Sequence, residues 1–146
     1  MVDILHRIGV TGSPDDVYAA LTTVDGLAGW WTEDVDGDGD TGGVLRFRFE
    51  PGGFDMLVLE AKAAELVLWE VVDGPDEWIG THIRFELSEE DGFTIVLFEH
   101  GGWKTPVPFM HHCSTKWATF LMSLKELVET GVGRPAPRDV KISNWH

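Results

Sequence analysis

The sequence predicts an α+β domain in which a curved six-stranded antiparallel sheet wraps around one long C-terminal helix, with two short helices after the first strand. Between Pro108 and Thr130, apolar residues recur at intervals of three and four, which places them on one face of a helix. Between residues 44 and 100, segments of alternating apolar and polar residues are joined by short turns, which favour antiparallel pairing.

The N-terminal segments predict a strand and the two short helices. Residues 3–10 alternate with period two, which is typical of a strand. Ser13 and Pro14 are typical of a helix N-cap and a first helical residue. We expect the Asp-Gly pair at positions 25 and 26 to end that helix, and residues 27–31 to form the second one.

The middle of the chain predicts an exposed loop followed by the other five strands. Residues 32–43 are rich in Asp and Gly, so we expect a solvated, mobile loop there. The expected strands span residues 44–50, 54–62, 65–72, 78–88 and 93–100, and the turn after the first of them contains Pro51.

The C-terminal part predicts the long helix and a tail. Pro108 can begin the helix, and Gly131 can end it in the left-handed conformation. Residues 132–146 form no clear element, but their apolar side chains can dock on the body of the protein. No linker divides the chain, so we expect one domain over residues 1–146.

The charge and the hydropathy pattern exclude several classes of partner. A formal net charge of −14 disfavours nucleic acid and anionic membrane surfaces, which both attract basic proteins. The sequence has no apolar run of membrane-spanning length, and its first residues lack a signal-peptide pattern. A single cysteine, Cys113, fits a reducing compartment, so we expect a cytoplasmic protein.

The order of elements resembles the START-like (Bet v 1-like, SRPBCC) helix-grip superfamily, and within it the branch named after the activator of the heat-shock protein 90 ATPase. The resemblance extends roughly from Ile4 to Glu129. The matching residues are Ser13-Pro14 and Val17, Leu27 with Trp30-Trp31, Gly92-Phe93-Thr94 with Val96, Phe98, His100 and Gly101, and Trp117 with Leu121 to Leu124.

The resemblance implies a cavity between the concave face of the sheet and the long helix. Large aromatic residues are the candidates to line that cavity, and the alternative is that they fill the core instead. These candidates are Trp30, Trp31, Phe49, Trp69, Phe98, Trp103 and Trp117.

Two histidines are further candidates for ligand contact. His100 alternates with Phe98 on an apolar face, and His112 lies on the same side of the long helix as Lys116. Successive helical residues point about 100° apart, so His111, His112 and Cys113 cannot converge on one metal ion. We therefore expect no metal and no other cofactor.

These observations predict that the protein binds a small hydrophobic molecule, lipid or polyketide-like, in the cavity. One alternative is a protein-interaction or chaperone-cofactor module. The other is a cyclase-like or hydrolase-like enzyme acting on a hydrophobic substrate, with His100 and a carboxylate such as Glu70 as acid and base. Ile95 and Leu97 are apolar on the opposite face of their strand, which predicts a homodimer through the outer face of the sheet.

Overall fold

The computed structural model describes residues 1–50 and 52–146, so Pro51 of the predicted turn lies outside the described residues. Its strands are β1 (Val2–Val10), β2 (Val35–Gly37), β3 (Val44–Arg48), β4 (Gly53–Lys62), β5 (Leu66–Asp73), β6 (His82–Glu90) and β7 (Phe93–Trp103). Its helices are α1 (Pro14–Thr22), α2 (Val24–Trp30) and α3 (Pro108–Thr130). The predicted α+β class and the order of elements are confirmed, with seven strands in place of six.

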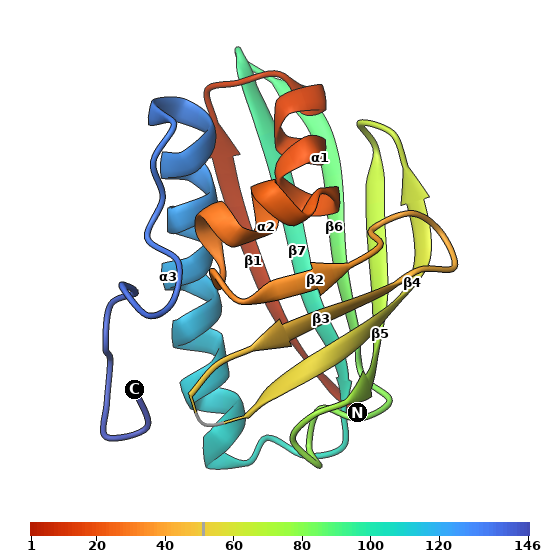
Figure 1. Cartoon of the computed structure of the whole chain (residues 1–146), viewed down its shortest axis with the longest axis vertical. Helices are drawn as coiled ribbons and strands as arrows, with labels where there is room; N and C mark the ends of the chain where they lie inside the picture. Colours follow the sequence, from red (N-terminus) through yellow and green to blue (C-terminus); the bar gives the residue numbers. More distant parts are fainter. Residues whose placement is uncertain (51) are drawn as a thin grey trace.

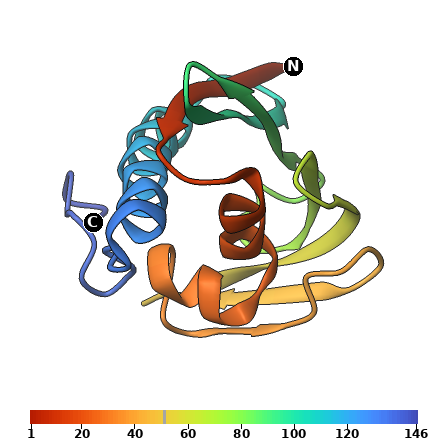
Figure 2. The same ribbon diagram turned by 90° about the horizontal axis from the view of Figure 1, so that it is seen from above.

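All seven strands form one antiparallel sheet in the order β1-β7-β6-β5-β4-β3-β2. Seen from above, the sheet curves around the helices, with α3 along one side and the two short helices near one end (Figure 2). Figure 1 shows α3 running lengthwise beside β1. On β6 the side chains of Ile83, Phe85 and Leu87 are buried in turn, so the core lies between the concave face and the helices.

The predicted start of α1 and both predicted ends of α3 are confirmed by their local geometry. The Ser13 hydroxyl accepts a hydrogen bond of 3.1 Å from the backbone N–H of Asp16, which caps the start of α1. Helix α3 begins at Pro108 and ends before Gly131, whose φ of 87° is the left-handed value that glycine adopts without strain.

The prediction for α2 was wrong at its start. The Thr23 hydroxyl accepts a hydrogen bond of 3.0 Å from the backbone N–H of Gly26. This cap begins α2 at Val24, so Asp25 and Gly26 lie inside the helix instead of separating it from α1. Trp31 follows as the C-terminal cap residue.

Two strand predictions were also wrong. A strand was missed among turn-forming residues, and another was predicted to begin too early. The acidic segment 32–43 contains β2, because Val35 is buried and pairs with Phe47 of β3. The strand predicted over residues 78–88 begins later, at His82. Gly80 has a φ of 85°, which turns the chain before the strand and leaves Trp78 outside the sheet.

The C-terminal tail, defined here as residues 132–146, lies against the body of the protein. Backbone hydrogen bonds join Ala136 to both Trp31 (2.8 Å) and Glu33 (3.1 Å). The buried hydroxyl of Ser123 donates to the carbonyl of Trp30 (2.8 Å) and accepts from the backbone N–H of Arg134 (2.7 Å). The first part of the tail therefore continues the packing between α2 and α3.

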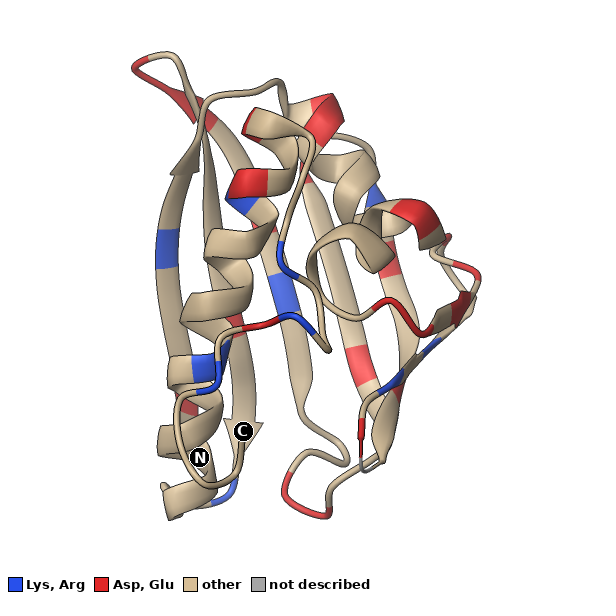
Figure 3. Ribbon diagram, turned by 60° about the vertical axis from the view of Figure 1, so that its left-hand side comes forward, with Lys and Arg blue, Asp and Glu red and all other residues tan. Residues whose placement is uncertain are grey.

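Acidic side chains are spread over the helices, strands and turns, and basic ones are fewer (Figure 3). Over residues 1–50 and 52–146, no helix is both long enough and apolar enough to cross a membrane.

Candidate functional site

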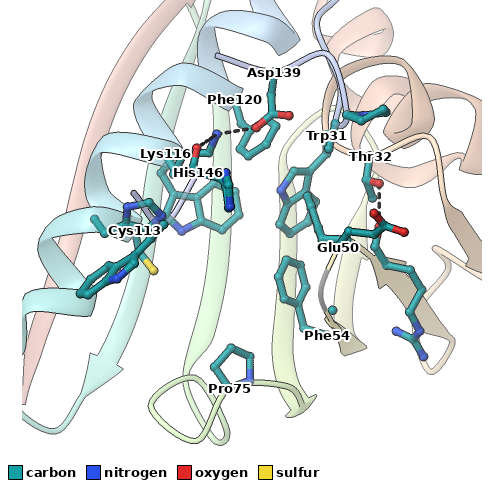
Figure 4. Close-up of a pocket in the computed structure, with 18 of the residues that line it drawn as sticks. Trp31, Thr32, Glu50, Phe54, Pro75, Cys113, Lys116, Phe120, Asp139 and His146 are labelled. Atoms are coloured by element: carbon teal, nitrogen blue, oxygen red, sulfur yellow. Dashed lines mark hydrogen bonds and ion pairs between the residues drawn. The ribbon is translucent and has the colours of Figure 1, made fainter. Parts of the chain in front are cut away.

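A cleft with a volume of about 910 Å³ opens between α3, the β3–β4 hairpin, the residues after α2 and the tail. Figure 4 shows Trp31 and Phe54 on one side of this cleft, with Lys116 and Cys113 of α3 on the other. Aromatic side chains make up most of its apolar wall: Trp31, Phe49, Phe54, Trp78, Phe109, Trp117, Phe120 and Trp145.

The structure distributes the nine predicted site residues over two layers. Trp31, Phe49, His112 and Trp117 line the cleft. The other five, which are Trp30, Trp69, Phe98, His100 and Trp103, are buried and do not line it. This second layer supports the first, because Trp69 stacks on Trp31 (ring centroids 6.0 Å apart) and Phe98 packs on Trp117 (4.5 Å).

Several cleft residues were missed from the sequence. Phe120 belongs to the apolar stripe of α3, so the helical spacing could have indicated it. Trp78 was assigned to a strand, whereas the turn before β6 brings it into the cleft wall. The tail was predicted to dock on the body through its apolar side chains, but nothing indicated that Asp139 faces the cleft, because an irregular segment has no periodicity from which to infer a facing side.

Buried His100 is held by a chain of hydrogen bonds. The indole N–H of Trp117 donates to His100 Nδ1 (3.0 Å), so Nε2 carries the ring proton and donates to Thr81 Oγ1 (2.9 Å). The Thr81 hydroxyl in turn donates to the carbonyl of Trp78 (2.5 Å). Burial, and secondarily the charge of His82, lowers the pKa of His100 to about 3, so the ring is neutral at physiological pH.

The carboxylate expected beside His100 is on the other side of the sheet. Trp69 and Val71 of β5 are buried on the concave face, and Glu70 between them projects from the outer face. Glu70 pairs in the ladder with His82, whereas His100 is opposite Ile83. The sequence-predicted acid and base are therefore not brought together.

One ion-pair cluster borders the cleft. The Lys116 ammonium contacts the carboxylate of Asp139, and Lys141 Nζ lies 2.8 Å from the same carboxylate. Only 14% of the Lys116 side chain and 7% of the Asp139 side chain are exposed. Burial alone would raise the pKa of Asp139, but hydrogen bonds from Lys116 and Lys141 outweigh it and lower that pKa.

His112 of α3 contacts the end of the tail. His112 Nδ1 lies 3.2 Å from the hydroxyl of Ser143, and the ring of Trp145 packs edge-on against His112 with centroids 5.6 Å apart. Burial, followed by the positive charge of Lys116, lowers the pKa of His112. Nδ1 of a neutral His112 ring can accept a hydrogen bond from the Ser143 hydroxyl.

The polar atoms in and behind the cleft wall are unevenly satisfied. Among residues 1–50 and 52–146, the buried indole N–H groups of Trp69, Trp78 and Trp103 have no hydrogen-bond acceptor. The described residues also contain no cluster of three or more His, Cys, Asp or Glu side chains arranged to hold a metal ion. Trp78 borders the cleft, but its indole N–H is buried within the wall and has no contact with the open space.

Comparison with known proteins agrees with this architecture. The family model described as "Activator of Hsp90 ATPase homolog 1-like protein" matches residues 11–129, which is most of the chain. The chain belongs to this AHSA1-like family. No protein with a curated description matches it.

Solved structures agree with this assignment. The chain is 46% identical to the protein in the solution structure of the Aha1 dimer from Colwellia psychrerythraea, with a TM-score of 0.85 over 91% of this chain and all of that one. CalU16 from Micromonospora echinospora is 20% identical (TM-score 0.79, 97% of this chain and 74% of that one). SSP2350 from Staphylococcus saprophyticus is 18% identical (TM-score 0.75, 90% and 95%). The last two share the fold of this AHSA1-like domain.

We predict that His100 makes the stability of the protein depend on pH. The unfolded ring binds a proton below pH 6.5, whereas the native ring stays neutral down to about pH 3, so stability falls as the pH drops through this window. Between pH 6.5 and 5, His100 is expected to lower the free energy of unfolding by about 2 kcal/mol, measured by urea unfolding.

The matched variants for this test are His100→Gln and His111→Gln, because His111 is exposed on α3. His100→Gln should lose this part of the pH slope, and His111→Gln should retain it. NMR titration of the wild-type ring gives a second measurement that does not depend on a variant, and a His100 ring charged at pH 5 in the native protein would contradict the prediction.

We also predict that Cys113 is unreactive in the native protein. The thiol is buried, and burial raises its pKa to about 12, so almost no thiolate is present at pH 8. Its reaction with 5,5′-dithiobis(2-nitrobenzoic acid) should be at least about 1000-fold slower than in guanidinium-unfolded protein. The chain has a single cysteine, so a rapid stoichiometric reaction of the native protein would show directly that the side of α3 carrying Cys113 is open.

Proposed function

We propose that this AHSA1-like domain binds a small, largely apolar molecule in the aromatic cleft. The observation that carries the proposal is the cleft itself, with a volume of about 910 Å³ and eight Phe and Trp side chains in its wall. Volumes of about 300–1,000 Å³ with mostly apolar walls are typical of small-molecule sites. A lipid or a polyketide-like compound has the required apolar character.

The structure of the wall supports recognition of a ring system or a flat apolar chain. Phe49 and Phe54 have centroids 5.1 Å apart, and Trp31 lies 5.1 Å from Phe54, so their faces form a continuous aromatic surface. Such rings gain contact area at little cost in side-chain entropy.

Binding has more support than catalysis. His100 has its nitrogen atoms engaged by Trp117 and Thr81, and Glu70 projects from the opposite face of the sheet. Hydrogen bonds from Lys116 and Lys141 engage the carboxylate of Asp139 and, against the effect of burial, lower its pKa. A carboxylate with a lowered pKa is a weak general base near neutral pH.

A second candidate function is self-association through the outer face of the sheet. The 46% identical relative from Colwellia psychrerythraea is described as a dimer. In this chain Leu5 of β1 and Leu97 of β7 are 68% and 44% exposed, whereas Ile95 beside them is buried. Leu97 lies opposite Arg7 and Glu86, so a second copy would meet leucines surrounded by charges of both signs. A chaperone-cofactor role, which the name of the family suggests, would also need an exposed surface for a protein partner.

The binding proposal is tested with N-phenyl-1-naphthylamine, an uncharged apolar probe whose fluorescence rises in apolar surroundings. We expect saturable binding at about micromolar concentration and a loss of at least about fivefold in affinity for Phe49→Ser, which removes one ring from the wall. Phe93→Ser is the matched control, because Phe93 is a partly exposed ring at the β6–β7 hairpin outside the cleft. Absence of saturable binding, or equal losses in both variants, would refute the proposal.

Self-association is tested by sedimentation at micromolar protein concentration. We expect the mass of two chains for the wild type, and for Leu97→Lys an increase of at least about tenfold in the dissociation constant, because a charge then faces the partner's apolar surface. Met122→Lys adds the same charge at a 47% exposed methionine on α3 and should leave the dimer intact. A monomeric wild type would remove this candidate.

A further inference from the structure

Lys116 is an unusual residue in the cleft wall because its ammonium group is largely withdrawn from solvent. Its side chain is 14% exposed, and Nζ lies 4.9 Å from the centre of the Phe120 ring. A lysine taken out of water needs anionic or carbonyl partners to offset its lost hydration. The identity of those partners therefore decides what this position of the cleft recognises.

Each partner that the structure gives to the Lys116 ammonium group belongs to the tail. The ammonium group contacts the carboxylate of Asp139 and donates to the carbonyl of Val140 (2.8 Å) and to the main-chain oxygen of His146 (3.2 Å). A lysine ammonium group has three donors, and these three acceptors match them. In Figure 4, Lys116 on α3 faces Asp139, with dashed lines marking the contacts of its ammonium group.

The segment that supplies these acceptors is held weakly. Pro135 is buried, whereas residues 137–146 are half-buried or exposed, although the side chain of Asp139 is only 7% exposed. Apart from Lys116, the attachment consists of a bond between Ser143 and His112, aromatic contacts of Trp145, and an exposed ion pair between Arg138 and Glu33. Exposed contacts of this kind contribute little free energy each, so the segment can be displaced by a competitor for Lys116.

The charge immediately around Lys116 favours an anion, although Glu33, Asp34 and Glu50 also line the cleft. Lys116 and Lys141 share the single carboxylate of Asp139, so these three side chains carry a net charge of +1. Arg48 and Arg138 are paired with Asp55 and Glu33, respectively. An acid group that replaced Asp139 would therefore meet two lysines beside an aromatic wall.

We propose, on the basis of the binding function above, that the ligand is an apolar organic acid, and that its anionic group takes the place of the Asp139 carboxylate on Lys116. The tail then acts as an internal substitute for the ligand. Its carboxylate occupies the anion position while the aromatic cleft beside it stays open. The ligand class is defined by an acid group attached to a ring system or chain that packs on Trp31, Phe49 and Phe54.

The test compares two probes that differ by one charge. 8-Anilino-1-naphthalenesulfonate is N-phenyl-1-naphthylamine with an added sulfonate, so the ratio of their affinities reports recognition of the anion. Lys116→Met should weaken binding of the sulfonate and lower the ratio of sulfonate affinity to neutral-probe affinity about tenfold or more. Asp139→Asn should strengthen binding of the sulfonate and raise that ratio about fivefold or more, since the internal competitor is removed.

Lys125→Met is the matched control for Lys116→Met. Lys125 is also a partly buried lysine of α3 with a carboxylate partner, Glu129, but it lies outside the cleft. It should change neither affinity, and thermal unfolding of each variant checks that the fold is retained. This inference alone would be overturned if the neutral probe bound but the affinity of the sulfonate did not change in Lys116→Met. Weaker binding of the sulfonate in Asp139→Asn would overturn it as well. Failure of both probes to bind the wild type would refute the proposed function itself.

Discussion

Trp31 and Trp117 meet across the aromatic cluster with ring centroids 4.9 Å apart, and much of the molecule depends on this contact. Trp31 follows α2 and Trp117 is in the middle of α3, so the pair joins two helices that cover different parts of the sheet. Trp31 also packs on Phe47 of β3 (4.3 Å) and stacks on Trp69 of β5. Rings therefore cover the part of the concave face where no helix lies, and a cleft remains beside them.

The position of Trp117 depends in turn on His100. A buried indole N–H without an acceptor costs roughly 1–3 kcal/mol, and the neutral imidazole removes that cost for Trp117. The core does not do the same for Trp69 and Trp103, whose N–H groups have no acceptor within the described part of the chain. One hydrogen-bonded chain thus runs from α3 through His100 to the turn before β6, which gives a histidine on an apolar face a structural role here.

The charged groups of the cleft, in contrast to His100, lie where the core is open to solvent. Lys116 projects from a helix whose apolar stripe faces the core, and within the described residues its hydrogen-bond acceptors all belong to the tail. Backbone hydrogen bonds hold the tail as far as Ala136, and mostly exposed contacts hold the residues after it. An aromatic wall, a withdrawn lysine and a weakly held carboxylate are consistent with a site where a ligand and a segment of the chain compete.

Much of the fold followed from the sequence alone, because periodicity, caps and turns act over a few residues. The spacing of apolar residues defined α3 with both of its ends, Pro108 and Gly131, and placed Phe98 and His100 on the concave face. Local signals were insufficient where two of them competed. Thr23 capped α2 across an apparent breaker, and Val35 formed a strand within a loop-like composition.

The site was decided by tertiary structure. Period two assigns a residue to the concave face but does not say whether α1 and α2 cover it or whether it lies beside an opening. Trp31 and Phe49 therefore line the cleft while Trp69 and Trp103 fill the core. The sequence alone determined the elements and the faces of their side chains. Only the packing of the helices and the tail on the curved sheet decided which aromatic rings face the cleft, and that Lys116 meets Asp139, 23 residues further along the chain.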